Sequence, residues 1–168
     1  MQIQEVDKLT YRKRLNIVIV ASVIALTTLS LGISQATIFF FTDREGTHFW
    51  INVMGVVVAL FALANVLKLY KHHAFLAEVY YVWRLKQQIN YIIRKQRKVE
   101  KAVDDNEVNA IIIMLFYYKA CDQLYRLDDN TITMGALTRQ SNALNQKVTD
   151  LNLNVSAQDY NEELLKAF

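Results

Sequence analysis

The sequence of 168 residues has no proline, one cysteine and only four glycines. Proline and glycine disrupt helices more than any other residue, and neither occurs between residues 56 and 134. We therefore predict an all-α protein. A single cysteine excludes an internal disulfide, and it excludes a zinc site built from several closely spaced thiolates. We expect Cys121 to be a small buried apolar residue.

Two long apolar runs occupy residues 15–41 and 49–70, and only seven residues separate them. A helix of about 20 apolar residues crosses a hydrocarbon core about 30 Å thick, so runs of 27 and 22 residues are long enough. The first run is longer than the core of a secretory signal and lacks the small residues of a cleavage site at its end. We predict an uncleaved transmembrane hairpin over residues 15–71, embedded in a lipid bilayer.

The orientation of the hairpin follows from the lysines and arginines beside the two runs, because cytoplasmic flanks carry an excess of them. The connecting loop has only Arg44, between Asp43 and Glu45. We expect both termini in the cytoplasm, with an N-terminal segment of residues 1–14 and a cytoplasmic helical domain of residues 72–168. The basic residues of the flanks are Lys8, Arg12, Lys13 and Arg14 before the first run, and Lys68, Lys71, Arg84 and Lys86 near the end of the second.

Each apolar run carries a row of small residues at four-residue spacing. Thr28, Gly32 and Ala36 form the row on the first run, and Gly55 and Ala59 form it on the second. Small residues allow helices to approach closely in lipid, and a short loop makes the two runs neighbours. We predict that the two rows pack against each other within one chain, with an oligomer interface as the alternative.

The segment after the second run has apolar residues at alternating steps of three and four over residues 74–103. This pattern is typical of an amphipathic helix with a heptad seam, as in a coiled coil. No glycine or proline separates this helix from the second run, so a single rod is one arrangement, and a bend at His72 and His73 is the other. We assign the seam to packing or to dimerisation. Its central residues are Val82, Leu85, Ile89 and Ile92.

Three further helices complete a predicted bundle of about four helices. The apolar stretch 108–118 is too short to cross a bilayer, so we expect the central helix of the domain there, covering the seam. Asp104 and Glu107 have the spacing of a capping box, and Ser156 is suited to cap the last helix. The three helices are expected to begin at about residues 107, 133 and 156.

Patterns that indicate catalysis or metal binding are weak. Asp128 and Asp129 lack the glycine and the spaced oxygen ligands of a calcium loop, and they lie where a helix end attracts acidic residues. The adjacent His72 and His73 do not converge on one metal as an i, i+4 pair does. We therefore expect no enzyme, no catalytic residue, no cofactor and no metal ion.

Seven lysines and arginines lie between residues 84 and 101, against Glu100 alone. Attraction to lipid headgroups decays within about 8 Å, so it requires a helix that lies along the membrane. Nucleic-acid binding requires stacking side chains, and only Tyr91 interleaves with this cluster. A solvated face balanced by acids elsewhere stays open, and so does the docking of an acidic partner. The residues that we assign to such a partner are Arg94, Lys95, Arg97 and Lys98.

Four segments carry a resemblance: YRKRLN at residues 11–16, VWRLKQQ at 82–88, RKQRK at 94–98 and LDDNTITM at 127–134. Together they resemble a family of small two-span bacterial inner-membrane proteins that is catalogued as a domain of unknown function. The resemblance covers nearly the full chain and implies a bacterial cytoplasmic membrane as the location. It supplies no activity, substrate or active-site residue.

The leading hypothesis is a membrane-anchored, non-enzymatic interaction or scaffold protein that presents a helical domain at the cytoplasmic face. Its partners are then the bilayer and either another protein or a second copy of the chain, with a small-molecule ligand left open. The alternative is an oligomeric pore or transport subunit, and the third hypothesis is a cytoplasmic metal-dependent enzyme at the paired aspartates. The pore requires convergence of Ser22, Ser30, Gln35 and Thr37 of the first run.

Overall fold

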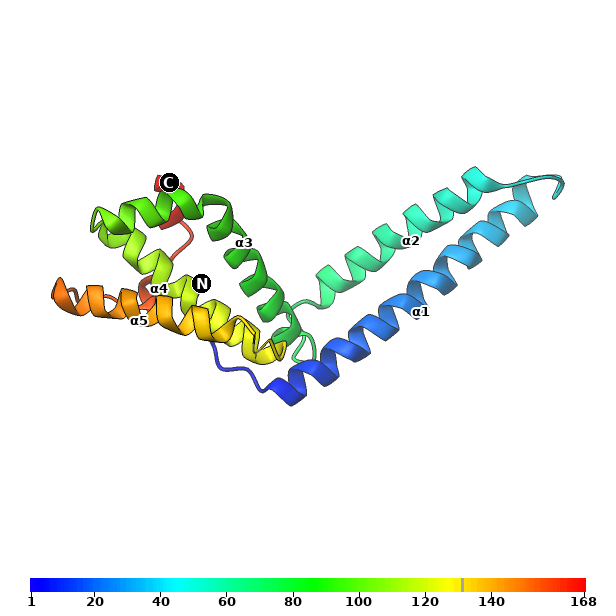
Figure 1. Ribbon diagram of the computed structural model, residues 1–168. Helices are drawn as coiled ribbons and strands as arrows, with labels where there is room; N and C mark the ends of the chain where they lie inside the picture. Colours follow the sequence, from blue (N-terminus) through cyan, green and yellow to red (C-terminus); the bar gives the residue numbers. More distant parts are fainter. Residues whose placement is uncertain (131) are drawn as a thin grey trace. The chain divides into compact units, whose positions relative to one another are not determined.

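The computed structural model describes residues 1–130 and 132–168, and in this part of the chain it is all-helical, as the sequence predicts. Two helices, α1 and α2, are long and apolar enough to cross a membrane, and further helices follow them (Figure 1). The resemblance segment 127–134 includes Thr131, which lies outside the described residues. The elements are α1 (Lys8–Phe41), α2 (Phe49–Tyr70), α3 (Ala77–Asp104), α4 (Val108–Leu127), α5 (Met134–Asp150) and the short 3-10 helices η1 (Ala157–Asp159) and η2 (Leu164–Ala167).

The chain folds as two compact units. One unit, here called the hairpin unit, consists of Leu9–Tyr80. The other, here called the helical domain, consists of Met1–Lys8 together with Tyr81–Phe168. The helical domain is therefore discontinuous in sequence, since the hairpin unit is inserted between its two pieces.

Within the hairpin unit, α1 and α2 run antiparallel and pack closely at Gly55 (Figure 1). A Cβ atom added to Gly55 would lie 2.9 Å from the main-chain oxygen of Ser30 and would also overlap the Ser34 hydroxyl. Gly55 and Ala59 are buried, so the small-residue row predicted for α2 is a packing face. Such close backbone contact is the usual way in which helices associate in lipid.

The prediction that the small-residue row of α1 packs against α2 is wrong. Thr28, Gly32 and Ala36 are exposed, and nothing in the hairpin unit lies within 4 Å of a Cβ added to Gly32. Ser34 is the buried residue, with 3% of its surface exposed. It lies about 160° around the helix from Gly32, because successive residues are about 100° apart. The α1 surface that contacts α2 therefore contains serine, and the row with glycine lies on the opposite surface.

Turns over residues 71–76 separate α2 from α3, so the two helices do not form one rod. The main-chain N–H of His73 donates to the Tyr70 carbonyl at 2.9 Å, and the N–H of Leu76 donates to the His73 carbonyl at 2.8 Å. Arg14, on α1, donates a 3.1 Å hydrogen bond to the Ala74 carbonyl. The interruption occurs at the histidine pair, where the sequence indicated a bend.

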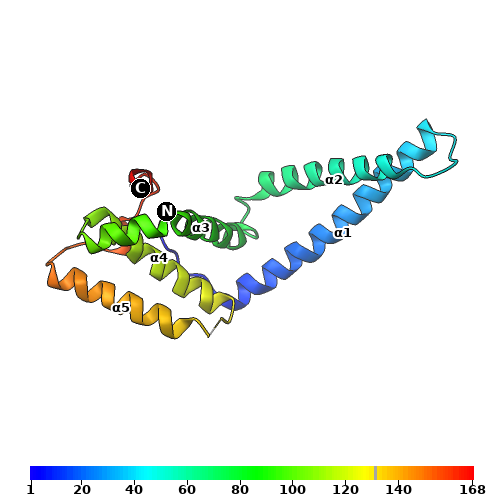
Figure 2. The same cartoon turned by 45° about the horizontal axis from the view of Figure 1, so that its top comes forward.

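The core of the helical domain lies around α4, which packs against α5, η1 and η2 (Figure 2). The prediction of a central helix at residues 108–118 is confirmed, since Ile111, Ile113 and Phe116 are each 0% exposed. Polar contacts connect the helix to α3, because the hydroxyl of Tyr81 donates to the carboxamide oxygen of Gln123 at 3.0 Å. The apolar face of α3 is buried inside the same domain.

The helix ends differ in part from those predicted. Asp104 is the last residue of α3, and Glu107 is the N-cap of α4 with no side-chain cap bond, so the predicted capping box is wrong. The cap at Ser156 is confirmed: its hydroxyl accepts from the Gln158 N–H at 3.2 Å, and its own N–H donates to Asp159 at 2.7 Å. This cap begins a 3-10 turn, and the segment 156–168 contains two such turns in place of one α-helix.

Candidate interaction site

The heptad seam and the basic cluster of α3 lie in different environments. The seam residues Val82, Leu85, Ile89 and Ile92 are between 0% and 6% exposed, so they pack inside the helical domain. Arg94, Arg97 and Lys98 are exposed, and Lys95 is half-buried. Steps of three and four place the first three on one side of the helix, together with Lys101. The basic surface of α3 therefore remains accessible, whereas the seam does not.

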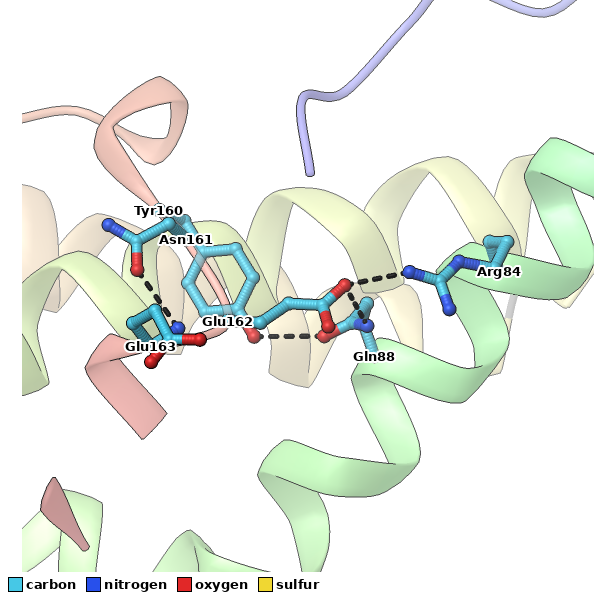
Figure 3. Close-up of polar contacts among 6 residues, drawn as sticks. All are labelled: Arg84, Gln88, Tyr160, Asn161, Glu162 and Glu163. Carbon is cyan, nitrogen blue, oxygen red and sulfur yellow. Dashed lines mark hydrogen bonds and ion pairs between the residues drawn. The ribbon is translucent and has the colours of Figure 1, made fainter. Parts of the chain in front are cut away.

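A segment from the C-terminal part of the chain, residues 157–168, lies against α3 through a polar cluster (Figure 3). The hydroxyl of Tyr160 donates to the carboxamide oxygen of Gln88 at 3.1 Å. The amide nitrogen of Gln88 donates to Oε1 of Glu162 at 2.7 Å, and Arg84 contacts the same oxygen at 2.8 Å. Gln88 is fully buried, and this cluster satisfies both ends of its carboxamide.

The ring of Tyr160 connects this cluster to the apolar core. It stacks on Phe116 of α4 with the ring centroids 4.0 Å apart and an interplanar angle of 16°. Burial raises the pKa of Tyr160 to about 12, and the charge of Glu162 acts in the same direction. The phenol therefore stays protonated at neutral pH, as its role as donor to Gln88 requires.

Two of the four basic residues predicted to bind a partner contact the chain's own segment 157–168. Lys95 donates to the main-chain oxygen of Leu165 at 2.8 Å, and Lys98 donates to the main-chain oxygen of Phe168 at 3.0 Å. Leu165 itself is buried, with 7% of its surface exposed. In the described part of the chain, Arg94 and Arg97 form no hydrogen bond or ion pair. Their charge is therefore not compensated by a direct partner.

A shallow groove lies beside these arginines. It has a volume of about 550 Å³ and is lined by Ile93, Arg94, Lys95, Arg97, Lys98 and Phe168. The side chain of Ile93 is exposed over 46% of its surface, so it offers the groove an aliphatic contact surface. The groove therefore combines an apolar surface with cationic sides.

The N-terminal segment packs on the same domain, which nothing in the sequence indicated. The main-chain N–H of Gln4 donates to the Tyr81 hydroxyl at 2.9 Å, and the Gln123 amide donates to the Gln4 carbonyl at 2.5 Å. With the bond from Tyr81 to Gln123 these contacts form a closed ring of hydrogen bonds. Burial raises the pKa of Tyr81, although the hydrogen bonds to Gln4 and Gln123 oppose the shift.

The aspartates considered for an enzyme site contact lysines. Asp128 lies 3.2 Å from Lys86, and Asp129 pairs with Lys8 of the N-terminal segment. Among the residues that the structure describes, no three His, Cys, Asp or Glu side chains come together in an arrangement that could hold a metal ion. The carboxylates of the two aspartates therefore bind cationic side chains of the same domain.

The polar residues considered for a pore lie on different sides of α1. Gln35 is exposed, whereas Ser30 lies at the contact with α2. The hydroxyl of Ser30 donates to the Thr27 carbonyl at 3.1 Å, and that of Thr37 donates to the Ile33 carbonyl at 2.8 Å. These two hydroxyls are therefore satisfied within their own helix. The pore hypothesis stays a prediction.

Comparison with known proteins gives a family but no activity. No curated protein and no solved structure matches the chain. A family model described as "Protein of unknown function (DUF3087)" matches residues 1–165. The match covers nearly the whole sequence, from the N-terminal segment that packs on Tyr81 to Leu165 at the basic surface of α3. The chain therefore belongs to the DUF3087 family of proteins of unknown function.

Proposed function

We propose that this chain is a non-enzymatic scaffold that is anchored in a bacterial cytoplasmic membrane and holds an acidic partner protein at the cytoplasmic face. The anchor is supported by the surface of the hairpin unit, where large apolar side chains such as Val23, Leu31 and Phe61 are 58–69% exposed. Such continuous apolar surface is costly in water and is suited to hydrocarbon. Both helices have the length that a crossing requires.

The contacts of the N-terminal segment support cytoplasmic termini. Residues 1–8 belong to the same compact unit as residues 81–168, which supports an arrangement with both ends of the chain on one side of the membrane. Basic residues precede α1 and follow α2, whereas the loop has Arg44 between two acids. The excess of Lys and Arg at the flanks favours the cytoplasmic side for both ends.

The observation that carries the scaffold function is the pair Arg94 and Arg97, which are exposed and unpaired within the described chain beside an apolar groove. A guanidinium group offers several donors to a carboxylate, and charge complementarity steers association with an acidic surface. Lys95 and Lys98, which line the same groove, already contact main-chain oxygen atoms of the chain itself. Of the cationic residues that line the groove, the two arginines are therefore the ones available to another protein.

The topology is tested by labelling single cysteines with a membrane-impermeant maleimide in a Cys121→Ala background. Glu45→Cys, in the exposed loop, should react in intact spheroplasts, whereas Asn142→Cys, on exposed α5, should react only in inverted vesicles. Labelling of Asn142→Cys from outside the cell contradicts the proposed orientation. Extraction of the unlabelled protein by alkaline carbonate contradicts the anchor.

The scaffold role is tested by photo-crosslinking in cells with the full-length chain. A photo-reactive amino acid at position 97 should give a discrete adduct with one protein, identified by mass spectrometry. The same residue at position 139, which is an exposed arginine of α5, serves as the matched control. Identical adducts from both positions, or none from position 97, count against a partner at the basic surface.

A further inference from the structure

The basic cluster of α3, residues 84–101, already binds one segment of known chemistry, which is the chain's own residues 157–168. Arg84 takes the carboxylate of Glu162 at 2.8 Å, and Lys95 takes the main-chain oxygen of Leu165 at 2.8 Å. The Leu165 side chain is buried beside these contacts. An acidic side chain, a main-chain oxygen and a buried leucine together form the recognition pattern, and the bound segment has two 3-10 turns and no α-helix.

The same chemistry is available again further along α3, where it has no occupant within the chain. Arg84 pairs with Glu162. Arg94 and Arg97, by contrast, have no hydrogen bond or ion pair in the part of the chain that the structure describes. The acid nearest in sequence, Glu100, accepts a hydrogen bond from Gln96 at 2.7 Å. Its position is about 60° around the helix from Arg97, toward the core-facing side.

The groove supplies the apolar contact that a bound segment would need. Ile93 is 46% exposed, and Phe168 is half-buried at the end of the docked segment. The two side chains line one groove together with both arginines. A ligand with charge alone would leave this apolar surface in water, and a ligand without charge would leave two guanidinium groups without a partner.

We propose that the groove lined by Ile93, Arg94, Arg97 and Phe168 binds an acidic peptide segment of a partner protein, in which large apolar side chains lie among carboxylates. The apolar side chains pack on Ile93 and Phe168, and the carboxylates pair with the two arginines. The segment binds in a non-α-helical conformation, as residues 157–168 do. This inference rests on the proposed scaffold function and specifies what the scaffold recognises.

Three labelled peptides test the proposal against the full-length protein in nanodiscs of neutral lipid, by fluorescence anisotropy. The peptide DEELLEDF has both features, DEESSEDS has the charge alone, and NQQLLQNF has the apolar side chains alone. We expect DEELLEDF to bind at least about tenfold more tightly than either other peptide, since each loses one kind of contact. Equal binding of DEELLEDF and DEESSEDS overturns the apolar part of the proposal.

Variants of the protein locate the site. Arg94→Glu combined with Arg97→Glu should weaken binding of DEELLEDF by about 100-fold, at about tenfold for each charge-assisted contact. The matched control, Lys119→Glu combined with Arg139→Glu, changes the net charge equally at exposed positions of α4 and α5 and should leave binding within about twofold. Equal loss in both double variants shows nonspecific attraction and overturns the proposal. Ile93→Ser should remove the preference for DEELLEDF over DEESSEDS.

Other classes of ligand provide the remaining outcomes. A DNA duplex or phosphatidylglycerol vesicles that bind through the two arginines more tightly than DEELLEDF overturn the assignment to an acidic peptide. Failure of this proposal is distinguishable from failure of the scaffold function. If no peptide binds while position 97 still gives its specific adduct in cells, the scaffold stands and the recognised chemistry is a different one.

Discussion

The hydroxyl of Tyr160 donates a hydrogen bond to the carboxamide oxygen of Gln88 at 3.1 Å, and both side chains are buried. Tyr160→Phe removes this donor and leaves the Gln88 oxygen without a partner, while the stacking on Phe116 is kept. We expect the free energy of unfolding to fall by about 1–3 kcal/mol, which is the cost of one unsatisfied buried polar group. Tyr91→Phe removes the same atom from an exposed ring and should change stability little. Chemical denaturation followed by circular dichroism measures both.

Gly55 is a position where α1 and α2 approach closely. Gly55→Ala places a Cβ atom 2.9 Å from the Ser30 main-chain oxygen, so the helices must separate. We expect a loss of about 1–3 kcal/mol in the stability of the hairpin, as for other overpacked contacts. Gly32→Ala, with open space around it, should be neutral or slightly stabilising, because alanine favours helix. Unfolding in mixed micelles compares the two, and equal effects would refute this packing.

The buried thiol of Cys121 makes stability depend on alkaline pH. Burial raises its pKa from 9.0 to about 11, so the unfolded chain releases this proton at lower pH than the folded chain. The contribution of the buried, protonated thiol to the free energy of unfolding is fully present below pH 9 and is lost as the pH rises to about 11. The difference in unfolding free energy between the wild type and Cys121→Ala should therefore shrink across this interval. Lysine titration is common to both proteins, so it cancels. A difference that stays constant from pH 8 to pH 11 contradicts burial of the thiol.

The N-terminal segment is held by Tyr81, which accepts a hydrogen bond from the Gln4 main chain and donates one to Gln123. Tyr81→Phe removes both bonds. We expect hydrogen exchange at the Gln4 amide to become about fivefold to tenfold faster, corresponding to roughly 1 kcal/mol of lost local stability. The exchange of α4 core amides such as that of Ile113 should change much less. Unchanged exchange at Gln4 would show that the ring of hydrogen bonds does not hold the segment.

Periodicity and length predicted much of the fold. The second apolar run coincides with α2, and the burial of Val82, Leu85, Ile89 and Ile92 follows from their spacing of three and four. The packing prediction for the row of small residues on α1 failed, because spacing places residues on one face of a helix but does not determine which face contacts the neighbouring helix. Contact at Ser30 and Ser34, and not at Gly32, depends on how the two helices pack.

The candidate site was only partly predictable. The positive charge of residues 84–101 was evident from the sequence. Which of these basic residues contact the chain itself depends on contacts between positions that are far apart in sequence. Gln88 and Tyr160 are 72 residues apart, and no local pattern connects them. The docking of residues 1–8 was not predicted for a similar reason. It uses the main chain of Gln4, and the type of side chain at that position does not indicate a main-chain contact.

The inserted position of the hairpin unit has a consequence for biosynthesis. Gln4 leaves the ribosome early, but its partner Gln123 is 119 residues further along the chain. The N-terminal segment therefore has no partner while both apolar helices are being made. Only afterwards do α3 and α4 exist to receive it, because domains generally fold as units during synthesis. Completion of the helical domain is thus ordered after synthesis of both apolar helices, so a native domain reports that the hairpin unit has already been made.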